Sequence, residues 1–148
     1  MVKVSKKLMY FFSLFLIFSH FSLASADPCR DWFSIDAHTQ QWQGTIKVKK
    51  GDKVEIYADG KWSYSAWRSP VGPEGIDTSW ATNVTDYCNH AALIGRIQGG
   101  PIFCVGRHKS FIAEKSGLLE FNINDGNTLK HDNSGKLRVF IKVNGKCK

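Results

Sequence analysis

The chain has 148 residues, the length of one domain, with 20 basic and 13 acidic side chains and a formal charge of +7 at pH 7. Hydrophobic residues make up 43% and aromatic residues 13% of it, which is enough to build a packed core and excludes a disordered polymer. Only 4 prolines and a charged fraction of 22% also exclude collagen-like and low-complexity classes.

The first 26 residues have the three parts of a secretory signal peptide. Three lysines within the first seven residues precede an almost wholly apolar run over 8–21, and Ala24-Ser25-Ala26 has the small-residue pattern that signal peptidase reads. A membrane anchor is the alternative, but the run is shorter than the roughly 18–20 residues of a spanning helix and is interrupted by polar residues. We expect cleavage after Ala26 and a secreted, periplasmic or extracellular domain over residues 27–148, without a transmembrane segment.

Removal of this segment leaves 17 basic and 13 acidic side chains, a formal charge of +4. The basic residues alternate with apolar ones, both around Lys47 and Lys49 and over residues 136–142, as on the solvent face of a strand. This weak and dispersed positive charge argues against a nucleic-acid partner.

Three segments alternate apolar and polar side chains with a period of two, which is typical of half-buried antiparallel strands. They lie at about 53–58, 119–124 and 137–143. In the last of them, Phe140 is an exception on the otherwise polar side. Turn signals are present at 50–52, 59–60, 99–101, 125–127 and 133–135. Short strands with close turns predict an all-β fold, a jelly-roll-like antiparallel β-sandwich.

The segment from Ala66 to Asn89 has no regular pattern and contains Trp67 and Trp80. An irregular stretch of this length inside a compact domain is either a functional loop or a sign that a regular element has been misread.

All four cysteines follow the signal segment: Cys29, Cys88, Cys104 and Cys147. An even number in an exported chain favours disulfides. Of the three possible pairings we favour Cys29–Cys147, which staples the ends of the mature chain, with Cys88–Cys104 closing a smaller loop. A zinc site that adds His90 and His108 to Cys88 and Cys104 is the alternative, although its spacing matches no common structural zinc motif.

No catalytic motif stands out in the sequence. It lacks the serine-hydrolase elbow, the H-E-x-x-H metalloprotease pattern, the dinucleotide fingerprint and the phosphate-binding loop. The four histidines of the mature chain are scattered, and each is expected on the surface or in a loop. We expect no enzyme, and a small hydrolase with an unrecognised pair of acids is the alternative.

The run from Asn124 to Gly135 lies between two expected strands and is rich in side-chain oxygen donors. These donors are Asp125, Asn127, Asp132 and Asn133. Calcium takes about 6–8 oxygen ligands from carboxylates, amides and carbonyls, and a loop that turns back on itself can bring such groups together. The other interpretation is that these are ordinary turn residues.

Five segments in the same order resemble the LecA-type (PA-I-like) galactophilic lectins of bacteria. They are Gly51–Ile56, Gly60–Tyr64, Gly72–Gly75, Ala92–Ile97 and the loop from Asn124 to Gly135. The resemblance covers about residues 42–143. It implies a galactose-binding-domain-like sandwich that binds carbohydrate through Ca²⁺.

The resemblance also implies the residues of the site. Calcium is expected to be held by the side chains of Asp125, Asp132 and Asn133 and by the backbone carbonyl oxygens of Tyr64 and Leu129. The metal then orients two vicinal sugar hydroxyls, which donate to Asp125 and Asp132.

Further sugar contacts are expected from the stretch after Gly75. Ser79 and Thr82 fall near the positions where the family has a sugar-binding His and Gln. Trp80 and Trp67 are candidates for stacking on the apolar face of a pyranose, or for packing the loop onto the sandwich. Residues 83–85 form an N-glycosylation sequon, which matters only in a eukaryotic secretory pathway.

These observations predict a secreted, calcium-dependent carbohydrate-binding protein, with galactose-type sugars as one candidate class. Because single shallow sugar sites are weak, useful avidity requires several copies, either in a homo-oligomer or arrayed on a surface. The alternative is a calcium-stabilised module that binds a protein partner through the 66–89 loop.

Overall fold

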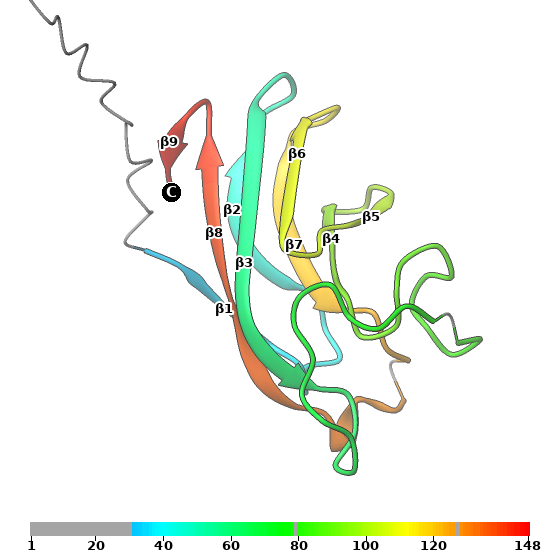
Figure 1. Ribbon diagram of the computed structural model, residues 1–148. Helices are drawn as coiled ribbons and strands as arrows, with labels where there is room; N and C mark the ends of the chain where they lie inside the picture. The colour runs from blue at the N-terminus through cyan, green and yellow to red at the C-terminus, as the bar shows by residue number, and fades with distance from the viewer. Residues whose placement is uncertain (1–30, 79, 127) are drawn as a thin grey trace, which may run out of the picture.

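The computed structural model describes residues 31–78, 80–126 and 128–148 (Figure 1). Its elements in chain order are β1 (Phe33–Asp36), β2 (Gln43–Val48), β3 (Lys53–Ser63), β4 (Leu93–Ile97), β5 (Ile102–Cys104), β6 (His108–Ile112), β7 (Gly117–Ile123), the 3-10 helix η1 (Lys130–Asp132), β8 (Ser134–Val143) and β9 (Lys146–Cys147). The predicted signal segment lies outside the described residues. Within the described ranges, no helix has the length and apolar character needed to cross a membrane.

The strands form two antiparallel sheets that pack face to face (Figure 1). The larger sheet has the order β1-β8-β3-β6, with β9 also paired to β8, and the smaller sheet has the order β2-β7-β4-β5. All of these pairs are antiparallel. This arrangement confirms the predicted jelly-roll sandwich.

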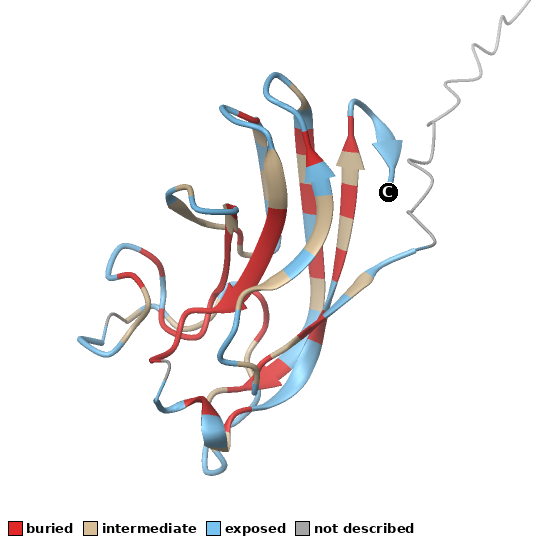
Figure 2. Ribbon diagram, turned by 180° about the vertical axis from the view of Figure 1, so that it is seen from behind, coloured by how far each residue is buried: buried red, intermediate tan, exposed pale blue. Residues whose placement is uncertain are grey.

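Alternation along the strands decides which side chains enter the core. From Val54 to Ala58 in β3 and from Leu137 to Val143 in β8, every second residue is apolar, buried and faces the smaller sheet. The residues between them, Phe140 included, are at least partly exposed. Figure 2 shows the resulting bands of buried residues along the long strands. The three strands expected from the period of two are confirmed as parts of β3, β7 and β8.

Two turn predictions are wrong. Asp59 and Gly60 lie inside β3, and the turn expected at 133–135 is largely the start of β8. Gly60 and Gly135 do have the positive φ angles of turn residues, 100° and 86°. The ladder nevertheless continues through both, with Gly60 opposite Leu137. Pairing with a long neighbouring strand therefore outweighs the local preference for a turn.

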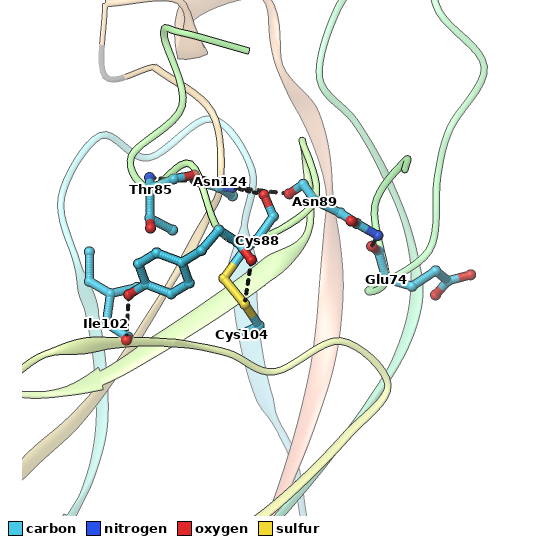
Figure 3. The surroundings of a disulfide bond; sticks show 8 residues. Glu74, Thr85, Cys88, Asn89, Ile102, Cys104 and Asn124 are labelled. Atoms are coloured by element: carbon cyan, nitrogen blue, oxygen red, sulfur yellow. Dashed lines mark hydrogen bonds between the residues drawn. A yellow bond between two sulfur atoms is a disulfide. The ribbon is translucent and has the colours of Figure 1, made fainter. Parts of the chain in front are cut away.

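One predicted disulfide is present. Cys88 and Cys104 are bonded, with their Cα atoms 5.6 Å apart, and this bond fastens the irregular loop to β5 (Figure 3). The alternative zinc site is therefore wrong, because both sulfur atoms are already used. The predicted pair Cys29–Cys147 falls partly outside the described residues, because Cys29 is not among them.

The segment between β3 and β4 is irregular, as predicted. Apart from isolated bridges of Trp62 to Val71 and of Ile76 to His90, its described residues form no strand. It lies at the same end of the sandwich as the segment that joins β7 to β8 (Figure 1). Two loops far apart in the sequence are thus neighbours in space.

An apolar groove lies between the edge strands of the two sheets, away from these loops. It runs between β5 and β6, where the rings of Phe103 and Phe111 lie 4.9 Å apart. Its lining includes Ile97, Ile102 and Ile112.

Candidate functional site

The two loops are in direct contact at Gly126. A Cβ atom at this position would lie 2.6 Å from the carbonyl oxygen of Thr82, which is too close for any side chain. Gly126 also donates its backbone N–H to Asp125 Oδ1 at 2.8 Å. The Asp-Gly pair in the sequence therefore permits this close approach and orients the carboxylate.

Asn124 ties the irregular loop to the end of β7. Its fully buried amide donates to the carbonyl oxygens of Thr85, Cys88 and Asn89 at 2.9–3.0 Å and accepts from the Thr85 N–H at 3.0 Å (Figure 3). Its backbone also pairs with Ala91 and Ala92. In the sequence Asn124 is only one member of a polar run, but in the fold its hydrogen bonds hold the two loops together.

Asp125 and Asn133 are brought together as the resemblance implies. Their side chains are only 2% and 4% exposed, and Asn133 Nδ2 donates to Asp125 Oδ2 at 3.0 Å. The same amide nitrogen donates to the Ala37 carbonyl at 3.3 Å. Asn133 Oδ1 is buried and receives no hydrogen bond from the described chain. A buried carboxylate therefore adjoins an amide oxygen that has no donor.

The other expected calcium ligands lie nearby in the fold. Leu129 and Asp132 are the N-cap and the last residue of η1, in the same loop as Asp125. Tyr64 follows β3 and reaches this end of the sandwich through its ring, whose centroid lies 4.7 Å from that of His90. Of the three expected side-chain ligands, Asp125 and Asn133 are in direct hydrogen-bond contact.

A buried lysine that sequence reasoning missed lies in the same loop. The Lys130 side chain is fully buried, and its ammonium donates to Asn122 Oδ1 at 3.0 Å. Burial lowers the pKa of Lys130 to about 8, and the nearby Asp125 carboxylate opposes that shift. Lys130 is therefore still largely charged at neutral pH and balances part of the charge of Asp125.

His90 lies in the segment between β3 and β4, as a loop histidine, but it is not on the surface, because only 1% of it is exposed. Its Nδ1 lies 2.7 Å from Asn83 Oδ1. Burial lowers the pKa of His90, and the Asp125 carboxylate partly opposes this effect. The short apolar run that begins immediately after His90 is the only sequence signal of this burial.

Aromatic rings cover His90. Trp80 stacks on it, with ring centroids 4.3 Å apart and planes at 16°, and the Tyr64 ring meets it edge-on. Trp80 therefore packs the loop onto the sandwich, while 42% of its surface remains exposed. Trp67 is 92% exposed. The predicted sugar contact Ser79 lies outside the described residues.

Unpaired polar atoms are concentrated at this end of the molecule. In the described part of the chain, three buried side-chain atoms have no hydrogen-bond partner: Asn83 Nδ2, His90 Nε2 and Asn133 Oδ1. Asn133 Oδ1 belongs to the amide that donates to Asp125. Asn83 and His90 contact each other, and the loop that carries them meets the Asp125 loop where Thr82 approaches Gly126 and where Ala91 donates to Asn124. The three atoms therefore lie where the two loops meet. Buried polar atoms are normally paired, so such a cluster indicates a place where water, an ion or a ligand completes the hydrogen bonding.

The chemistry of the donors restricts which metal fits. The described residues contain no group of three or more His, Cys, Asp or Glu side chains arranged to hold a metal. A zinc-like site is therefore not formed there. The candidate donors are instead carboxylate, amide and carbonyl oxygens, which is the ligand set that calcium prefers.

The sequence matches no protein-family model and no curated protein. Among solved structures, the chain is similar to the N-terminal domain of EclA, described as a PllA-like lectin. The two share 23% sequence identity with a TM-score of 0.61, over 76% of this chain and 94% of that one. The chain has a lectin-like fold. At this level of identity the similarity shows the architecture alone.

Proposed function

We propose that this protein is an exported carbohydrate-binding protein that uses calcium and has no enzymatic activity. The observation that carries the proposal is the cluster of buried, unpaired polar atoms where the Asp125 loop meets the irregular loop, at the end of a lectin-like sandwich. It is supported by the absence of catalytic motifs from the sequence. It is also supported by the Cys88–Cys104 disulfide, which is typical of exported proteins.

Calcium would be held by the side chains of Asp125, Asp132 and Asn133, with carbonyl oxygens from Tyr64 and Leu129. The buried carboxylate and the donor-free amide oxygen of Asn133 fit a hard divalent cation. When bound, calcium supplies a positive charge that polarises and orients sugar hydroxyls. The chain itself contributes the rigid placement of the oxygens and hydrogen-bond acceptors for those hydroxyls.

The sugar would lie between the two loops. Asp125 and Asp132 would accept from vicinal hydroxyls, and Ser79 and Thr82 would make polar contacts at the rim. The exposed part of Trp80 offers apolar surface beside them, since its ring is held in place by His90. Galactose-type sugars are the first class to test.

The metal is tested by thermal unfolding of the exported protein with calcium, and then with a chelator in excess. A ligand that binds only the native state at about 100 times its Kd stabilises it by about 2.7 kcal/mol. For a domain of this size, that corresponds to a rise in Tm of about 10 °C. The variant Asp125→Asn keeps the shape of the side chain and should lose this response. Asp77→Asn, an exposed aspartate in the irregular loop, is the matched control and should keep it.

The sugar is tested on a glycan array, with and without calcium. Binding that requires calcium and is lost in Asp125→Asn supports the proposal. A calcium response without any glycan binding would favour the interaction module that binds a protein partner through the 66–89 loop. Unchanged glycan binding in the chelator, or in Asp125→Asn, would contradict the calcium mechanism.

A further inference from the structure

A row of four aromatic rings crosses the outer face of the larger sheet, away from the loops. It consists of Trp32 just before β1, Phe140 on β8, Tyr57 on β3 and His108 on β6. Tyr57 is the register partner of both Phe140 and His108. The ring centroids of Trp32 and Phe140 lie 6.4 Å apart, and those of Tyr57 and His108 lie 4.5 Å apart, nearly parallel at 28°. Phe140, Tyr57 and His108 therefore lie at facing positions of three neighbouring strands, and Trp32, just before β1, extends this row.

These side chains face solvent. The residues on either side of Tyr57 and Phe140 in their strands are buried, so the rings themselves point out of the sandwich. Trp32 is 52% and Tyr57 is 40% exposed, and His108 is also exposed. Cross-strand aromatic pairs stabilise a sheet, but an exposed row of them is also what a binding surface presents.

Positive charge surrounds the row. The guanidinium of Arg138 lies 5.8 Å from the Trp32 ring centroid, and the ammonium of Lys142 lies 5.8 Å from that of Tyr57. Basic side chains outnumber acidic ones on this face: Lys53, Lys61, Lys136, Arg138 and Lys142 against Asp36, Glu55 and Asp59. The three acids are each already in an ion pair with one of the basic residues. The face therefore carries a net positive charge.

We propose that this face is a second carbohydrate-binding surface, which takes an extended chain of an acidic polysaccharide built from uronic acids. Neighbouring strands lie about 4.8 Å apart, so the row is about 14 Å long, the length of a short oligosaccharide. The rings would stack on the apolar faces of successive sugars. Lys142, beside the Tyr57 ring, would pair with a sugar carboxylate, whereas Arg138 is already paired with Asp59.

The surface is separate from the calcium loop. The row crosses β3 at Tyr57, and the strand continues to Ser63 before it reaches the loop end, a distance of about 20 Å along the chain. Binding here needs no metal. The inference therefore does not rest on the calcium site and can fail or succeed independently of it.

The net positive charge of this face favours a polyanion over a second copy of the chain as its partner. Two copies that met through this sheet in a symmetric dimer would place the same basic face against itself, and like charges in contact oppose association. A polyanion neutralises the same charges. The row of aromatic rings distinguishes a sugar chain from a simple counter-ion, because an inorganic anion gains nothing from aromatic surface.

The test measures binding of galacturonic acid oligomers to the exported protein in the presence of a chelator, by calorimetry. The methyl-esterified form of the same oligomer is the matched probe, because it keeps the sugar rings and removes the charge. We expect binding of the acid form, weaker binding of the ester by at least about tenfold, and loss of affinity as salt rises. Asp125→Asn should bind the acid form as the parent chain does.

The variants Trp32→Ala and Tyr57→Ala should each lower the affinity about tenfold, the usual effect of removing an aromatic side chain at the centre of a contact. Trp67→Ala removes a more exposed ring that lies away from the row, and should change nothing. Lys142→Gln should weaken binding of the acid form alone, whereas Lys49→Gln should not. The lysine pair keeps the test valid if an aromatic variant unfolds.

Several results would overturn the proposal. They are equal affinity for the acid and the ester, unchanged affinity in Tyr57→Ala, and tighter binding of single-stranded DNA than of the uronate oligomer. A dimer in sedimentation experiments that Tyr57→Arg dissociates would also overturn it, since the row would then be a protein interface.

Discussion

Replacement of Asn124 by Ala should destabilise the whole loop end of the sandwich. The amide of this residue is fully buried and satisfies the backbone of Thr85, Cys88 and Asn89. Alanine offers neither a donor nor an acceptor. The backbone groups that bond to the Asn124 amide would then face a methyl group, which cannot replace these hydrogen bonds.

The expected loss follows from the hydrogen bonds. Each intramolecular hydrogen bond contributes about 1 kcal/mol net, and a buried group left without a partner costs about 1–3 kcal/mol. The N–H of Thr85, a residue only 9% exposed, loses its acceptor, and three carbonyl oxygens lose a donor. Because the bonds share one amide, we expect a total of about 3 kcal/mol rather than a full sum. For a domain of this size, that lowers the Tm by about 12 °C.

The assay is thermal unfolding followed by circular dichroism, with the disulfides intact and a chelator present so that metal binding does not contribute. Asn89→Ala is the matched control, because its amide is exposed and donates one hydrogen bond, to the Glu74 carbonyl at 3.1 Å. That variant should lose about 0.5 kcal/mol, or roughly 2 °C. A shift in Asn124→Ala as small as in this control would refute the idea that Asn124 holds the two loops together.

Three further predictions concern the same end of the molecule. Gly75→Ala should prevent stable folding, because Gly75 has a φ of 68° and a Cβ there would overlap the backbone of His90; wild-type yield and Tm would contradict this. Lys130→Met should tighten calcium binding about threefold to tenfold in calorimetry, since it removes a positive charge next to Asp125, whereas weaker binding would mean that the ammonium mainly positions the loop. After expression in a eukaryotic secretory host, intact-mass measurement should find no glycan on Asn83 of the folded protein, because its Nδ2 is buried, and a folded, glycosylated product would refute this placement.

The strands were predictable because their signal is local. In the core segments of β3 and β8, each apolar residue sits two positions from the next, and burial of one face is enough to fix both the element and its orientation. The same logic failed at Gly60, because a turn-forming residue gives no sign that the neighbouring strand continues past it. Phe140 is an exception to the alternation in its strand, and only the strand pairing shows that it lies opposite Tyr57, which in turn lies opposite His108.

The candidate site was predictable in part, for a different reason. Asp125 and Asn133 belong to one short loop, so a sequence resemblance suffices to propose that they act together, and they lie 3.0 Å apart. His90 and Asn83 belong to another segment, and no local pattern relates either of them to Asp125. Their proximity depends on the close packing of the two loops.

The sequence by itself determined the two-residue alternation that makes this chain a β-sandwich, the cysteines available to fasten it, and the oxygen-rich composition of one loop. These properties depend on residues close together in the chain, and the backbone geometry of a strand or a short loop fixes how such side chains are placed relative to one another. The tertiary structure decided which loop packs against this oxygen-rich loop, that His90 and Lys130 are buried at this end of the sandwich, and that Trp32 and three rings of neighbouring strands form one row. Such relations depend on the order in which strands pair, and pairing brings together residues that are far apart in the chain.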